Sequence, residues 1–209
     1  MLRSIKEILG IRLLTDEGII GKVQDFYFNY EDWTIRYLVI KTGPWIFGRK
    51  VSIPTTKLGS PDLKSRLIPV SLTKEQIEND VSYNAETLIT PQQDYLRPIS
   101  EVIEYQVYGE DGGIGEVDDF IFEEHETWLI RSLVVKMRER LFSKKVVIAS
   151  MFVELISFGR SMIYLNLIRD TIGNSPEFNR EEHINKELET SPYPGPAVNL
   201  SRPYEQGDN

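Results

Sequence analysis

The sequence contains no cysteine and only two histidines among its 209 residues. Disulfides, thiolate metal sites and a cysteine nucleophile are therefore excluded. Long hydrophobic runs are also missing, because segments such as Val146–Ala149 and Met151–Val153 fall far short of the roughly 20 apolar residues that a membrane-spanning helix needs. Charges at Arg3, Lys6 and Glu7 interrupt the first residues, so the pattern of a signal peptide is not present. We expect a cytoplasmic protein without a membrane span.

Basic residues are the minority, with 24 Lys and Arg against 32 Asp and Glu and a net charge of −8. This balance repels phosphate backbones at long range and disfavours nucleic acid as a general partner. Two local exceptions each follow an aromatic residue, Arg49–Lys50 and Lys144–Lys145. Solvated strand ends are the favoured interpretation of both pairs, and a nucleic-acid contact is the alternative.

An internal duplication organises the chain. Three phrases recur in order and spacing: LRSIKEI (2–8) as LRPISEV (96–102), GIIGKVQDFYF (18–28) as GGIGEVDDFIF (112–122), and WTIRYLVIK (33–41) as WLIRSLVVK (128–136). One added residue falls between the second and third phrases of the second copy, which places a loop tip there. We therefore predict a first unit at 1–84, a polar linker at 85–95, a second unit at 96–179, and a poorly ordered tail rich in proline and glycine at 180–209.

Within each unit the sequence favours short β-strands. The run GKVQDFYF predicts a half-buried strand with a two-residue period, placing Val23, Asp25 and Tyr27 on one face and Gln24, Phe26 and Phe28 on the other. Thr73 followed by Gln76 three residues later predicts a capping box at the start of a short helical turn. We predict an all-β fold with two small antiparallel β-barrels in tandem, since closure removes exposed sheet edges.

The duplicated phrases resemble the PRC-barrel family, named after the cytoplasmic domain of the photosynthetic reaction centre H subunit. The likeness is carried by DEGIIGKVQDF with WTIRYLVIKTGPWIFGRKVSI, and by DGGIGEVDDF with WLIRSLVVK. It implies a tandem PRC-barrel protein in which each compact β-barrel, with a short helical turn, is an interaction module rather than a catalyst. Related domains occur in the H subunit, which has a membrane helix that this sequence lacks, and in a ribosome maturation factor.

The stretch GGIGEVDDF invites a phosphate-loop or metal-loop interpretation, but a strand rather than a helix follows it, so no helix N-terminus is available for phosphate. The first copy also replaces Gly113 by Ile19 and Asp118 by Gln24. The residues that both copies share are Gly18 with Gly112, Gly21 with Gly115, and Asp25 with Asp119. We expect the glycines to allow a tight hairpin with positive φ, and each Asp to accept hydrogen bonds from neighbouring backbone or an arginine. A weak cation site in the second copy is the alternative.

Two further shared pairs have structural interpretations. Trp33 and Trp128 precede corresponding strands, where an indole can cover one end of a barrel. Arg36 and Arg131 lie within those strands, and we hypothesise that they pair with Asp25 and Asp119 on one sheet face.

Trp45 differs between the copies, because TGPWIFGRK becomes MRERLFSKK. Trp45, with Arg49 and Lys50 beside it, is therefore the predicted partner-binding site, and packing of the indole within the protein is an equal alternative. His125 and His183 are interpreted as solvated residues rather than metal ligands. We predict no catalytic residues, no metal and no cofactor.

The function expected from these features is a non-enzymatic protein–protein interaction or scaffold module. Its two barrels would pack as an intrachain pseudo-dimer, since self-complementary surfaces of a homodimer can persist when two copies join in one chain. The alternatives are an accessory protein of a membrane electron-transfer complex of the reaction-centre type, or a ribosome- or RNA-associated adaptor. The protein partner is not identified by the sequence.

Overall fold

The computed structural model describes residues 1–42, 49–80, 83–85, 95–124, 127–137 and 144–180. This part of the chain is mostly β-strand, which confirms the predicted all-β class. Up to residue 85 the elements are β1 (Leu2–Ser4), α1 (Ile5–Ile8), β2 (Arg12–Thr15), β3 (Gly18–Asn29), β4 (Thr34–Thr42), β5 (Lys50–Pro54), η2 (Thr55–Lys57), β6 (Leu67–Pro69) and α2 (Lys74–Asn79). From residue 95 they are β7 (Leu96–Pro98), α3 (Ile99–Val102), β8 (Gln106–Gly109), β9 (Gly112–Glu123), β10 (Ile130–Met137), β11 (Lys145–Ala149), η6 (Ser150–Phe152), β12 (Val153–Ser157), η7 (Phe158–Arg160), β13 (Met162–Leu165) and α4 (Arg169–Gly173).

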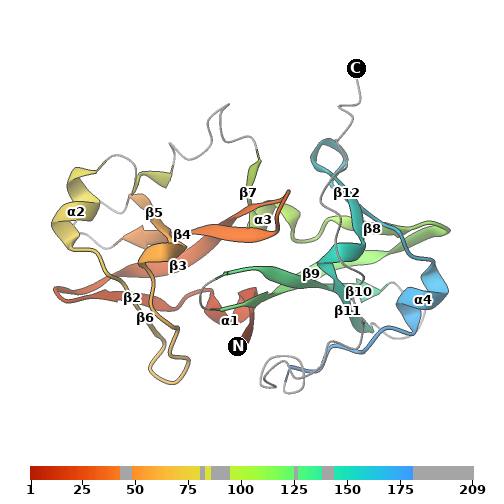
Figure 1. Ribbon diagram of the computed structural model, residues 1–209, viewed down its shortest axis with the longest axis horizontal. Coiled ribbons are helices and arrows are strands. Elements are labelled where there is room, and N and C mark those ends of the chain that lie inside the picture. The colour runs from red at the N-terminus through yellow and green to blue at the C-terminus, as the bar shows by residue number, and fades with distance from the viewer. Residues whose placement is uncertain (43–48, 81–82, 86–94, 125–126, 138–143, 181–209) are drawn as a thin grey trace.

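The strands form two sheets, one centred on β3 and one centred on β9 (Figure 1). One sheet has the order β5-β4-β3-β2-β6 and the other β11-β10-β9-β8-β13-β12. Both are mixed, because β2 runs parallel to β6 and β8 runs parallel to β13. The prediction of wholly antiparallel barrels is therefore wrong in strand direction, and the pairings among the described strands leave each sheet open rather than closed into a barrel. Alternating hydrophobicity marks a strand but does not specify its direction.

The first strand of each repeat pairs with the sheet of the other repeat. Strand β1 runs antiparallel to β9, with Ser4 opposite Ile121, and β7 runs antiparallel to β3, with Pro98 opposite Tyr27. Figure 1 shows α1 and α3 near the middle of the molecule, where the two sheets meet. The two sequence repeats are therefore joined by a reciprocal exchange of their N-terminal strand and helix.

The hydrophobic core is continuous across the two repeats. Phe26 and Phe28 of β3 face Phe122 and Phe120 of β9, with ring centroids 6.4 and 6.2 Å apart. All four side chains are fully buried. Burying aromatic side chains of this size contributes on the order of 2–3 kcal/mol each, so the contact between β3 and β9 stabilises both halves.

The predicted alternation of side chains in β3 is wrong before Asp25, because the strand contains a β-bulge. Val23 pairs with Ile40 and Asp25 with Val39, so Gln24 is the extra residue of the bulge. The bulge shifts the two-residue period, and Val23 is therefore buried in the same core as Phe26 instead of facing the opposite way. Strand β9 repeats this irregularity at Asp118.

The shared glycines serve two different purposes. Gly18 and Gly112 have φ of 107° and 138°, which confirms the positive φ expected at the hairpin turns. For Gly21 and Gly115 that expectation is wrong, because neither has a positive φ. They are needed for close approach, since a Cβ there would lie 2.5 or 2.1 Å from a carbonyl oxygen of the neighbouring strand. The capping box of Thr73 and Gln76, by contrast, is present as predicted at the start of α2.

Gly10 and Glu104 occupy corresponding positions after the exchanged helices. Their φ angles are 76° and 70°, and both backbone N–H groups donate to a bulge-strand carbonyl, of Val23 and Val117 respectively, at 2.9 Å. The left-handed conformation costs a non-glycine residue about 1–2 kcal/mol. Glu104 therefore carries strain that Gly10 avoids.

We predict that Glu104→Gly leaves the protein as stable or up to about 1 kcal/mol more stable, because relief of the left-handed conformation outweighs the added chain entropy. Gly10→Ala should destabilise it by about 1 kcal/mol for the converse reason. Urea unfolding measures both. A stabilising Gly10→Ala would contradict the assignment of strain.

Candidate functional site

Asp25 and Asp119 bind the helices that the repeats exchange. The carboxylate of Asp119 in β9 accepts hydrogen bonds from the Ser4 hydroxyl and from the backbone N–H of Lys6, the latter at 3.3 Å. Asp25 in β3 accepts from the hydroxyl and, at 3.1 Å, the backbone N–H of Ser100. Each Asp therefore satisfies a backbone donor in the first turn of a helix contributed by the other repeat, as an N-cap side chain would.

Each carboxylate also accepts a hydrogen bond from the next backbone N–H in its own strand, at 2.8 Å from Phe26 or Phe120. This confirms the prediction that the shared Asp residues bind neighbouring backbone. Each Asp directly follows the extra residue of the bulge, which is Gln24 in β3 and Asp118 in β9, and bulges change the direction of nearby side chains. The same local irregularity thus positions both carboxylates against the exchanged segments.

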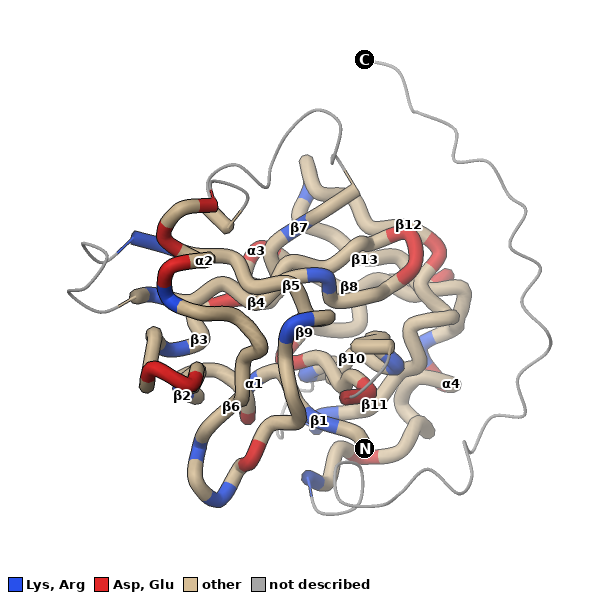
Figure 2. The backbone as a smooth tube through the Cα atoms, turned by 60° about the vertical axis from the view of Figure 1, so that its left-hand side comes forward, with Lys and Arg blue, Asp and Glu red and all other residues tan. Residues whose placement is uncertain are grey.

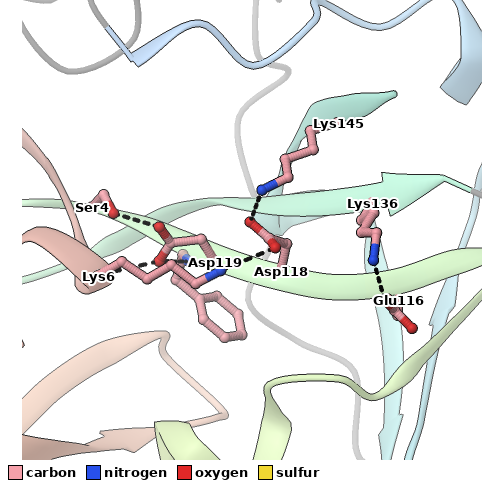
Figure 3. A network of polar contacts seen from close by, with 8 residues as sticks. Ser4, Lys6, Glu116, Asp118, Asp119, Lys136 and Lys145 are labelled. Atoms are coloured by element: carbon pink, nitrogen blue, oxygen red, sulfur yellow. Dashed lines mark hydrogen bonds and ion pairs between the residues drawn. The ribbon is translucent and has the colours of Figure 1, made fainter. Parts of the chain in front are cut away.

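Asp119 is the more deeply buried of the two carboxylates, with 3% of its surface exposed. Burial raises the pKa of Asp119 above its ordinary value, although the hydrogen bonds that it accepts act in the opposite direction. The adjacent Asp118 binds the ammonium groups of Lys6 at 3.0 Å and Lys145 at 2.9 Å. Burial acts to raise the pKa of Asp118 as well, but these two lysines outweigh it and hold the pKa below the usual value. Figure 3 shows this network.

The exchanged strands are also held by their arginines. Arg3 in β1 forms a buried ion pair with Glu124, with Nε 2.6 Å from one carboxylate oxygen and Nη2 3.3 Å from the other. Arg97, the corresponding residue in β7, lies over the ring of Phe158 with its guanidinium carbon 4.6 Å from the centroid. The arginines at corresponding positions of β1 and β7 therefore hold their strands in different ways, one by a bidentate ion pair and the other by a cation–π contact.

The hypothesis that Arg36 and Arg131 pair with the shared Asp residues is wrong. Arg36 binds Asp32 in the turn just before its own strand, and Arg131 binds Glu123 across the β9–β10 pair. The carboxylates of Asp25 and Asp119 are occupied by serine and backbone donors from the other repeat instead. Sequence comparison within one repeat could not show these donors.

Trp33 and Trp128 pack onto the phenylalanines of the core. Their rings lie 5.9 Å from Phe28 and 5.2 Å from Phe122, respectively. Both tryptophans have positive φ, 59° and 48°. Their carbonyls accept hydrogen bonds from the other repeat, since Ile130 N–H donates to Trp33 at 2.8 Å and Ile35 N–H donates to Trp128 at 2.9 Å. The tryptophans therefore join the repeats through backbone as well as side chain.

The predicted partner-binding residues fall in three different settings. Trp45 lies outside the described residues. Arg49 is half-buried, and its guanidinium donates to the carbonyl of Ile77 at 3.4 Å. Lys50 is exposed in β5, directly opposite the exposed Lys41 of β4. Of the two described residues, Lys50 is exposed and Arg49 is half-buried.

A groove of about 310 Å³ lies where a loop of the first repeat meets the second repeat. Its lining residues are Thr55, Thr56, Leu58, Gly59, Ser60, Pro61 and Trp128. The lining contains hydroxyl and apolar groups and no titratable side chain, so it has no general acid or base.

Metal-binding groups are not assembled in the described part of the chain, which holds no cluster of three or more His, Asp or Glu residues that could bind an ion. His125 and His183 lie outside the described residues. At the candidate cation site of the second copy, which lies in strand β9, the Asp118 carboxylate is bound by two lysines and the Asp119 carboxylate by Ser4. The arrangement is suited to joining two halves of a protein.

Sequence reasoning missed Ser4, Ser100 and the Arg3–Glu124 pair. A signal for them exists in the repeated phrase at 2–8 and 96–102, whose retention in both copies marks it as part of the shared architecture. The phrase does not reveal which repeat its strand joins.

A mixed sheet with a bulged central strand and a following capped helix defines the first repeat as a small β module. Residues 3–77 match the family described as PRC-barrel domain. A comparison with curated proteins found no matching relative. None of the described helices has the length and apolarity to cross a bilayer.

We predict that Asp119→Ala lowers the free energy of unfolding by about 1–3 kcal/mol, because it leaves buried donors without an acceptor. Asp25→Ala should cost less, about 0.5–2 kcal/mol, since Asp25 is partly exposed and water can replace it. Chemical denaturation measures both, with Asp16→Ala in the exposed β2–β3 turn as the control. Equal and negligible effects at Asp25 and Asp119 would contradict the capping role.

The two adjacent carboxylates should respond to acid in opposite directions. Asp118 has a lowered pKa in the folded state, so its stabilising contribution is present above the unfolded pKa and is lost as pH falls through the folded value. Asp119 has a raised pKa, so its contribution is fully present below the unfolded pKa and is lost as pH rises through the folded value. The destabilisation caused by Asp118→Asn should therefore shrink on acidification, whereas that of Asp119→Asn should grow. Unfolding curves recorded from neutral pH to about pH 3 test this pair, and parallel pH profiles would refute it.

Proposed function

We propose that the second repeat is also a PRC-type unit, and that the two units form an intrachain pseudo-dimer that acts as a non-enzymatic protein-interaction scaffold. The observation that carries the proposal is the reciprocal exchange, in which β1 pairs with β9 and β7 pairs with β3. Each unit supplies a strand, a helix and a helix-binding carboxylate to the other. Such an arrangement resists separation, because parting the units breaks backbone ladders as well as side-chain contacts.

The chemistry of the shared motif supports a scaffold rather than an enzyme. Each of its two carboxylates accepts hydrogen bonds from a serine hydroxyl and from two backbone N–H groups, so most of its acceptor sites are occupied by structural donors. The groove between the repeats has a lining without titratable groups. These features favour a function in binding, with the binding surface held in a fixed orientation by the exchanged strands.

The rigidity of the pair is tested by nuclear magnetic resonance relaxation of backbone amides. We expect the two units to share one rotational correlation time in the wild type, because the exchanged strands connect them. Two distinct correlation times in a folded wild-type protein would contradict the pseudo-dimer.

Partner binding is tested by affinity capture with the full chain. We expect Trp45→Ala to lose a specific protein that the wild type retains, while circular dichroism shows an unchanged fold. Arg36→Ala serves as the control, since Arg36 is exposed and, among the described residues, forms its ion pair with Asp32 of its own repeat. Turnover of a small-molecule substrate by the purified chain would overturn the non-enzymatic assignment.

A further inference from the structure

Four basic residues lie side by side across the outer face of the first sheet. The strand registers place Arg12 opposite Lys22, Lys22 opposite Lys41, and Lys41 opposite Lys50. These four residues, from β2, β3, β4 and β5, are named the cation row. The neighbouring register positions Val23, Ile40 and Val51 are buried in the core, so the cation row projects from the opposite face of the sheet.

The cation row is not neutralised within the described structure. None of its four side chains forms an ion pair or hydrogen bond with another described residue. The three lysines are exposed and Arg12 is partly exposed. Figure 2 shows basic segments beside β3 and near α2, in a chain whose net charge is −8.

The second repeat has a different charge pattern at the same positions. Its corresponding row is Gln106, Glu116, Lys136 and Lys145, joined by the same registers. There Lys136 binds Glu116 at 3.1 Å and Lys145 binds Asp118 at 2.9 Å. The first repeat replaces both of these carboxylates, with Lys22 in place of Glu116 and Gln24 in place of Asp118.

The uncompensated positive charges of the cation row are expected to destabilise the first repeat. Like charges directly opposite each other on adjacent strands are destabilising, and the second repeat shows that the same backbone accepts the neutralised arrangement. An uncompensated row that costs stability is typical of a surface used for binding.

We propose that the cation row is a docking surface for an acidic protein helix, which presents carboxylates along one face. This inference rests on the scaffold function proposed above and names the chemistry of one partner. Adjacent strands are about 4.8 Å apart, so the row spans about 14 Å. Carboxylates on one helix face recur every three or four residues with Cβ atoms about 5–6 Å apart, which matches the strand spacing. An extended peptide repeats its side chains on one face about every 6.8 Å, which matches less well.

A nucleic acid is the less favoured ligand for this row. A long phosphate polymer contacts a wide area of the surface, where the acidic excess of the whole chain opposes its binding. A short acidic helix touches the row without approaching the rest of the surface. The described cation row also lacks an aromatic member on which a base could stack.

The binding test uses a fluorescent alanine-based helical peptide with glutamates at i, i+4, i+7 and i+11. Its matched control peptide has the same composition, with the glutamates distributed around the helix. We expect the full chain to bind the first peptide more tightly than the second, with an affinity that falls as salt is raised. Fluorescence anisotropy measures both peptides.

Lys22→Glu is the decisive variant, because it introduces the carboxylate that the second repeat has at Glu116 and places it opposite Lys41. The variant should fold and be at least as stable as the wild type, while its affinity for the peptide falls about tenfold. Lys57→Glu makes the same change in net charge at an exposed site outside the row, and we expect less than a twofold effect there. Equal losses in the two variants would show a general charge effect and overturn the proposal.

Three further outcomes overturn the proposal. The first is equal binding of the two peptides. The second is binding of single-stranded oligothymidylate as tight as that of the acidic peptide, which would mark the row as a phosphate site. The third is self-association of the wild type that Lys22→Glu abolishes, as seen by sedimentation, which would assign the row to a second copy. If peptide binding fails but Trp45→Ala still loses a captured protein, the scaffold function stands and the docking surface alone is wrong.

Discussion

The rest of the structure depends on the capping of each exchanged helix by a carboxylate of the other repeat. Asp119 is nearly fully buried, and two of its three hydrogen-bond donors lie more than a hundred residues away, in the segment from Ser4 to Lys6. A buried carboxylate without such donors is costly, so the second repeat depends on the N-terminal segment of the chain for a completed sheet. In the same way, Asp25 of the first repeat accepts hydrogen bonds from Ser100, in the first segment of the second repeat. In the proposed pseudo-dimer the two halves would therefore constrain each other and hold their outer faces in one relative orientation.

Much of the local structure follows from comparing the two repeats within the sequence. The strands around β3 and β9, the hairpin glycines Gly18 and Gly112, and the capping box of α2 could be predicted, because each depends on residues close together in the chain. The exchange could not be predicted, since a strand at residues 2–4 has the same sequence whether it pairs with its own repeat or with the other. The bulges were missed for a related reason: one extra residue shifts the period without changing composition. Asp25 and Asp119 lie opposite Val39 and Val134, three residues along the strand from Arg36 and Arg131, so the predicted pairs do not meet.

Comparison of the two repeats also distinguishes features that the backbone conformation requires from surface residues that can differ. Positive φ recurs at Trp33 and Trp128 and at Arg66 and Ser161, although the second pair shares no side-chain chemistry. These positions are set by the path of the chain, which fixes the conformation and leaves the side chain free to differ. The register of the outer row likewise recurs, but its charges do not, since Lys22 stands where the other repeat has Glu116. The charge difference is therefore not imposed by the fold.

A row of uncompensated cations on an acidic protein has a consequence for selectivity. At distances beyond the Debye length of about 8 Å, exposed charges are largely screened, so a partner near the row responds mainly to the four local positive charges. A large polyanion contacts a wider area and meets the acidic remainder of the surface, which opposes its binding. The excess of acidic residues would then disfavour large polyanions, while the cation row attracts a small acidic partner. If the exchanged strands fix the orientation of both sheets as proposed, a partner docked on the first repeat would also be held in a defined position relative to the ion-paired face of the second.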